Sequence, residues 1–145
     1  MALPTFPVSD AIQFVPGAGT FVVERFVDPS GTPVDVVDID VGFTVSGRIE
    51  LPGWLSGRGL VRLAADQIGG PFDGSIGQQT VNITGSTSPT DPRIMRYDWS
   101  ITVMSPTLPD RDEMYQLGVL FAFQTPSGGH TDIGGFYDLG AVLVV

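Results

Sequence analysis

Long stretches of alternating apolar and polar residues constrain the fold of this chain more than any other feature. In the longest stretch, nearly every second residue from Val37 to Leu51 is apolar, and the residues between them are mostly charged or hydroxyl-bearing. The same alternation returns from Met95 to Val103 and from Tyr115 to Phe123. A repeat of two puts all apolar side chains on one face of a β-strand, whereas a helix needs a repeat of 3.6. The chain is therefore predicted to be all-β.

Within these segments the odd-numbered residues are predicted to point inward. Turn-forming clusters rich in Gly, Pro, Asp and Ser separate about seven to nine short, mostly antiparallel strands, which is typical of a single β-sandwich of immunoglobulin-like or jelly-roll type. Residues 1–16, broken by prolines, are expected to form an extended arm before a domain spanning 17–145. The side chains predicted to be mostly buried are Phe43, Val45, Ile49, Tyr97, Trp99, Ile101, Leu117, Val119 and Phe121.

Several strand bounds follow from the same pattern. Val36–Leu51 is too long for one strand and should bend or change sheets at Gly42 or Gly47. A first short strand is expected near Ala11–Val15 and a terminal one over Phe136–Val145. Between other strands, the segment from Gly69 to Ser75 is predicted to be a loop.

Composition excludes several classes of partner. The 145 residues carry a net charge of -9, with sixteen acidic residues against seven arginines and no lysine. Nucleic acid and an anionic membrane surface are therefore not expected as partners. The chain has no cysteine, which excludes disulfides and thiolate metal sites, and no cofactor is expected. The first residues have no basic region followed by an apolar run, so a secretory signal is not predicted, and a cytoplasmic or particle-associated location is expected.

Catalytic residue types are scarce. His130 is the single histidine, and it lies between Ser127 and Asp132 in a Gly-rich segment. A catalytic triad needs its three groups on separate rigid elements, which neighbours on one loop do not provide. We therefore expect a protein that is not an enzyme.

Acidic residues raise the question of a calcium site. Asp38 and Asp40 are expected to share one face of a strand, and Asp110, Asp112 and Glu113 cluster further along. Calcium binds six to eight oxygen ligands, but no recognisable calcium loop is present. Carboxylates interspersed in a Val-rich and Ile-rich strand also prevent edge-to-edge aggregation. This second role is favoured, and no metal ligand is assigned.

Two regions are candidates for interaction. Trp54 and Leu55 are expected at a hairpin tip, where the tryptophan would stack on a sugar, enter a partner's pocket or cap the end of the sandwich. Ala141–Val145 is apolar on both faces, so it requires cover from the N-terminal arm or from a neighbouring subunit. The candidate interaction residues are Phe6, Phe14, Trp54, Leu55, Leu143 and Val145.

These observations favour a non-enzymatic structural or protein-interaction subunit that packs into a larger assembly, such as a virion, a tail-like particle or a filament. Either a homo-oligomer or a different protein partner is expected. The alternative is a β-sandwich module that binds carbohydrate or calcium.

Overall fold

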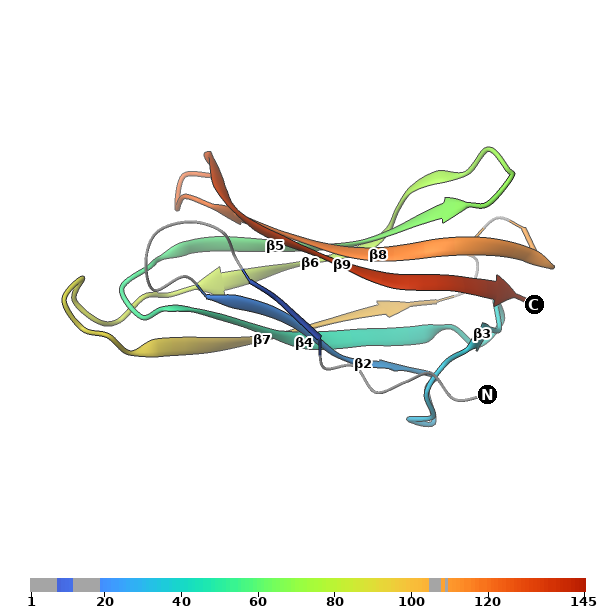
Figure 1. Ribbon diagram of the computed structural model, residues 1–145, viewed down its shortest axis with the longest axis horizontal. Helices are drawn as coiled ribbons and strands as arrows, with labels where there is room; N and C mark the ends of the chain where they lie inside the picture. The colour runs from blue at the N-terminus through green and yellow to red at the C-terminus, as the bar shows by residue number, and fades with distance from the viewer. Residues whose placement is uncertain (1–7, 12–18, 105–107, 109) are drawn as a thin grey trace.

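The computed structural model describes residues 8–11, 19–104, 108 and 110–145. Within these ranges the chain forms nine strands and no helix, which confirms the predicted all-β class. The strands belong to two sheets that are not closed into a barrel. Figure 1 shows the sheets as two layers, with β8 and β9 in one layer and β2, β4 and β7 in the other.

The four-stranded sheet contains only antiparallel neighbours. Its order is β1 (Val8–Ala11), β2 (Thr20–Val27), β4 (Phe43–Pro52) and β7 (Ile94–Val103). The five-stranded sheet is antiparallel except at one edge, where two short segments run parallel. Its order is β3 (Val36–Val37), β9 (His130–Val144), β8 (Glu113–Gln124), β5 (Gly57–Gln67) and β6 (Asp73–Ile83).

One hydrophobic core lies between the two sheets and draws on both. At its centre Phe21 of β2 stacks on Trp99 of β7, with ring centroids 5.5 Å apart, and on Phe121 of β8 at 5.7 Å. Eight of the nine side chains that the alternation predicted to be buried are buried. The exception is Tyr97, which is only partly buried against the core because β7 is the last strand of its sheet.

The segment from Val36 to Leu51 changes sheets, as its length predicted. Its first two residues form β3 beside β9, and Phe43 begins β4 in the other sheet. Gly42, rather than Gly47, marks the corner, because its φ of 83° lies in the left-handed region that glycine adopts without strain. A side chain at Gly42 would also meet the Val103 carbonyl oxygen, 2.2 Å from the position of its Cβ.

The corner changes the interpretation of two acidic residues. Asp38 and Asp40 were expected on one face of a strand, and this expectation is wrong, because both lie in the turn between β3 and β4. The Asp38 carboxylate accepts a hydrogen bond from the Asp40 backbone N–H at 2.9 Å. Aspartate stabilises turns in this way, because its short side chain reaches the backbone two residues later.

Three other bounds differ from the sequence-based expectation. The strand expected near Ala11–Val15 is instead β1, which ends at Ala11, and residues 12–15 lie outside the described ranges. The expected loop over Asp73–Ser75 forms the start of the edge strand β6, because its pairing with β5 extends to Asp66 and Asp73. The terminal strand begins at His130 rather than Phe136, because its pairing with β8 extends that far.

A bulge in β9 decides which of its side chains face outward. The register with β8 shifts between Leu117 and Gly118, and Gly140 on the opposing strand has a φ of 88°. Inward side chains therefore change from odd to even numbers after Leu139, so that Val142 and Val144 are buried. Bulges produce this change of phase by placing an extra residue in one strand.

Candidate functional site

The outer face of the four-stranded sheet carries a network of ion pairs. Arg48 donates from Nη1 to Glu24 at 2.9 Å and from Nε to Glu50 at 3.2 Å. Arg96 donates from Nε to Asp98 at 2.9 Å and lies 3.7 Å from Glu24. The hydrogen bond to Asp98 is the main cause that raises the pKa of Arg96 above its ordinary value. We call this surface, made by Glu24, Arg48, Glu50, Arg96 and Asp98, the charged face.

The outer face of the five-stranded sheet carries most of the exposed large apolar side chains. Among the described residues, eleven large apolar side chains are exposed, and seven of them lie on this sheet or directly continue its strands. We call this surface the apolar face, and its large residues are Val36, Ile68, Met114, Leu120, Phe136, Leu143 and Val145.

Strand pairing places three large side chains of this face in one row. Leu120 in the middle of β8 lies directly opposite Phe136 of β9 on one side and Arg62 of β5 on the other. Phe136 is 52% exposed and Leu120 is 41% exposed. Leu120 lies on an interior strand, whereas β3 pairs with β9 only at Leu143 and Val144, so that β9 is the edge of the sheet at Phe136. We call this row of three large side chains, Phe136, Leu120 and Arg62, the ridge.

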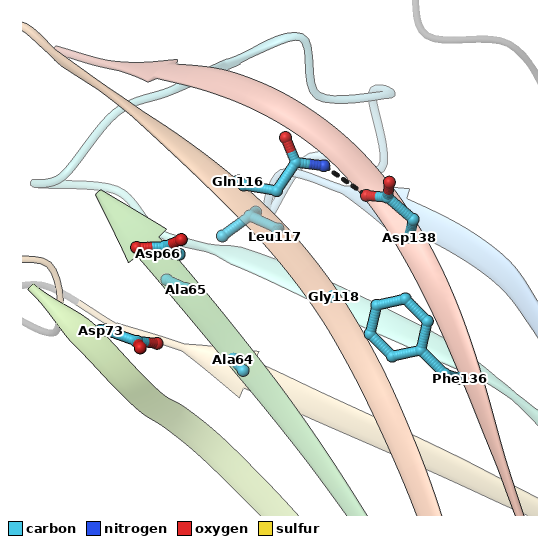
Figure 2. Close-up of a pocket in the computed structure, with 9 residues that line it drawn as sticks. All are labelled: Ala64, Ala65, Asp66, Asp73, Gln116, Leu117, Gly118, Phe136 and Asp138. Carbon is cyan, nitrogen blue, oxygen red and sulfur yellow. Dashed lines mark hydrogen bonds between the residues drawn. The ribbon is translucent and has the colours of Figure 1, made fainter. Parts of the chain in front are cut away.

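A hollow of about 370 Å³ lies beside the ridge. Its floor contains small residues, Ala64 of β5 and Gly118 of β8, while Phe136 forms part of its wall. Figure 2 shows Phe136 on the β9 side of β8, with Asp66 and Asp73 on the side of β5 and β6. Gly118 is buried because the Phe136 ring lies over it, and the position of a Cβ on Gly118 is 2.8 Å from that ring.

The charges around the hollow are unevenly satisfied. Asp138 accepts hydrogen bonds from the Gln116 side-chain amide and, at 2.8 Å, from the Gly140 backbone N–H. Asp66 and Asp73 are direct cross-strand partners, so two carboxylates face the same side of the sheet. Like charges in this position repel each other. Within the described residues, no ion pair neutralises either carboxylate, and none involves Arg62.

The structure separates the interaction residues that the sequence suggested. Leu143 and Val145 lie on the apolar face, exposed by 37% and 38%. Trp54 is 37% exposed in the turn between β4 and β5, but its neighbour Leu55 belongs to the core. The Leu55 side chain packs inward at this turn, where the Leu55 N–H bonds to the Pro52 carbonyl oxygen at 3.1 Å. Phe6 and Phe14 lie outside the described residues.

The centre of the apolar face was not predicted from the sequence. Leu120 and Phe136 were not among the candidates, and neither was Met114. One signal was present: between Tyr115 and Phe123 the even-numbered residues include Leu120 and Ala122, so that the strand is apolar on both faces. Such a pattern indicates cover on both sides of a strand.

The other acidic and catalytic candidates are not assembled into a site. Arg111 donates to Asp40 at 2.6 Å, and this hydrogen bond raises the pKa of Arg111 above its ordinary value. In the part of the chain that the structure describes, no group of three or more His, Asp or Glu side chains is arranged to hold a metal ion. His130 is exposed at the start of β9, and the hydroxyl of Ser127 contacts that of Thr125 at 3.2 Å.

No helix long and apolar enough to cross a membrane occurs among the described residues. Comparison with known proteins gives no match to a family model, to a curated protein or to a solved structure.

Proposed function

We propose that this protein is a non-enzymatic interaction subunit that packs into a larger assembly through its apolar face. The assembly would be of the kind formed by accessory domains of virions, tail-like particles or filaments. One observation carries the proposal: seven of the eleven exposed large apolar side chains among the described residues lie on the five-stranded sheet or directly continue its strands. Exposed apolar surface gathered on one face of a soluble protein marks a site of association.

The arrangement of the sheets supports a β-sandwich as the scaffold of this subunit, of immunoglobulin-like or jelly-roll type. Both sheets contribute to one core, and their neighbouring edges are joined where the Ser100 N–H donates to the Gln79 side-chain oxygen at 2.6 Å. A pair of packed sheets leaves its two outer faces available for contact with a partner.

The proposal is tested by measuring the molar mass of the full chain by light scattering after size exclusion. We expect species larger than a monomer, or a partner that co-purifies, and we expect Leu120→Asp to abolish that association. Thr102→Asp is the matched control, because Thr102 points outward from the four-stranded sheet. A wild-type monomer without any partner would contradict the proposal. Equal association of wild-type protein and Leu120→Asp would also contradict it.

Carbohydrate binding is a second candidate, favoured by the hollow beside Phe136. An aromatic ring next to Gln116 and Asp138 combines a stacking surface with hydrogen-bonding groups, which is what sugar recognition requires. Titration of the protein with soluble oligosaccharides tests it, with Phe136→Ala as the variant expected to lose binding. Failure of every sugar to bind, together with association through the same face, would exclude this candidate.

A further inference from the structure

The apolar face carries features that specify a partner, and the inference drawn from them rests on the proposed function. We infer that this face binds a second copy of the chain, with the two copies related by a two-fold axis that runs across the strands. In this arrangement the ridge of each copy enters the hollow of the other. Arg62 of each copy then meets Asp66 and Asp73 of its partner.

Shape is the first argument. The ridge and the hollow lie side by side on the same surface, because Leu120 and Arg62 directly precede or follow Gly118 and Ala64 on the outward side of their strands. The two-fold axis runs perpendicular to the strands, between the row of Leu120 and Arg62 and the row of Gly118 and Ala64. Rotation about this axis reverses the strand direction and places each row of one copy over the other row of its partner. Leu120 of one copy is then placed over Gly118 of the other, where the Phe136 ring that covers this glycine gives the leucine an apolar contact. Self-complementary contacts of this kind are the rule in two-fold dimers.

Charge is the second argument. Asp66 and Asp73 face each other across two strands without a cation, and Arg62 is an exposed cation without an ion pair within the described residues. Arg62 and Asp66 are four residues apart on β5, or about 13 Å, so they do not pair within one copy. The exchange of rows places Arg62 of one copy over Ala64 of the other, about 7 Å from Asp66 along the strand. The long arginine side chain spans that interval, so the pair forms twice in each dimer.

Area is the third argument. The outward rows of β9, β8 and β5 cover about 14 Å across the strands and about 34 Å along them. This corresponds to roughly 500 Å² in each copy, and the sum for both copies lies near the ~1,000 Å² at which specific interfaces begin. The expected dimer is therefore reversible and depends on concentration.

Charge reversal tests the pairing. We expect Arg62→Glu and Asp66→Arg each to weaken self-association by at least about tenfold, because each homodimer would place two pairs of like charges together. An equimolar mixture of the two variants should regain the wild-type affinity as a heterodimer. In that heterodimer the introduced glutamate of one variant meets the introduced arginine of the other, and the unchanged Asp66 meets the unchanged Arg62. Sedimentation velocity of the full chain over a range of concentrations measures both variants and their mixture.

Controls separate this inference from the proposed function. Arg25→Glu makes the same change of charge on the outer side of the four-stranded sheet and should leave dimerisation unchanged. Circular dichroism and melting curves confirm that each variant is folded. Self-association that is lost in Leu120→Asp but is not restored by the mixture would overturn the arrangement and leave the proposed function standing. The wild type could instead be monomeric and co-purify with a different protein that Leu120→Asp no longer binds. That result would overturn the second copy as the partner and leave the proposed function standing. A wild-type monomer that binds nothing would overturn both.

Discussion

The outer faces of the two sheets differ more than any other pair of regions in this molecule. On the charged face, outward positions of β4 alternate strictly with the core, and Arg48 and Glu50 take part in ion pairs. On the apolar face, Leu120 and Phe136 are cross-strand partners on the outward side of β8 and β9, and both are exposed. Both sheets cover the same core, so the demands of folding on their inner faces are alike.

The requirements of a soluble fold explain the side chains of the charged face, but they do not explain those of the apolar face. A core with charged outward positions satisfies both stability and solubility, and the charged face fulfils this pattern. The exposed parts of the leucine and phenylalanine side chains contribute little to the stability of the monomer, but burying the remaining exposed half of each would contribute roughly 1 kcal/mol. A surface that retains them gains this free energy only on association.

The largest expected effect concerns the assignment of inner and outer faces on which the comparison depends. Ile101 is 3% exposed, and its Cγ2 leaves no room for a side chain at Gly77. Replacing Ile101 by Asp buries an unpaired charge and should destabilise the fold by about 4 kcal/mol or more. The neighbouring Thr102→Asp, which points outward, should cost less than about 1 kcal/mol. Urea unfolding of both variants measures the contrast. Equal stabilities would contradict the assignment, and a larger loss in Thr102→Asp would show that β7 has the opposite phase.

A smaller effect should distinguish the two faces through their arginines. Arg48→Met removes two ion pairs of the charged face and should lower the free energy of unfolding by roughly 1 kcal/mol in low salt. Arg62→Met on the apolar face removes none within the described residues, so the stability of the monomer should change by less than about 0.5 kcal/mol.

Salt provides the control for this pair of variants. In about 1 M NaCl the screening length falls to about 3 Å, so the cost of Arg48→Met should shrink while that of Arg62→Met stays the same. Thermal unfolding at a protein concentration low enough to keep the chain monomeric is the measurement. A cost of Arg48→Met that does not depend on salt would indicate lost packing rather than lost ion pairs.

The sequence predicted the inner faces well because the information for them is local. Alternation within single strands identified Val45, Trp99 and Leu117 as core residues, and all three are buried. The charged outer positions of β4 can be read from the same alternation. These predictions need no knowledge of which strands are neighbours, since a repeat of two assigns each side chain to a face wherever the strand lies.

The apolar face could not be predicted in the same way, because it depends on the register between strands and on a bulge. Phe136 meets Leu120 because the consecutive strands β8 and β9 pair in one particular register. Leu143 points outward only because the bulge near Gly140 reverses the phase of the last residues. Neither the register nor the bulge is encoded in a short pattern, so the apolar C-terminal strand was the nearest that sequence-based prediction came to this site.

A still smaller effect concerns a polar atom on the inner side of β7. The Tyr97 hydroxyl is buried and has no hydrogen-bond partner within the described residues. Removing a buried hydroxyl that lacks a partner also removes its desolvation penalty. Tyr97→Phe should therefore leave the free energy of unfolding unchanged or raise it by up to about 1 kcal/mol. Chemical denaturation is the measurement, and a loss of more than that amount would reveal a partner for the hydroxyl.

The smallest expected effect is that of added calcium on the melting temperature. It tests what the carboxylates near the apolar face bind. Asp40 is engaged by Arg111, and the Asp38 carboxylate is engaged by the turn backbone. Asp66 and Asp73 supply two carboxylates, too few for the six to eight oxygen ligands of calcium without several waters.

A ligand that binds the folded state raises its stability by mass action, so weak binding gives almost no shift. We expect about 2 mM calcium to change the melting temperature by less than about 1 °C. A rise of several degrees that disappears with EDTA and in Asp66→Asn would instead assign the paired carboxylates to a metal rather than to Arg62 of a second copy.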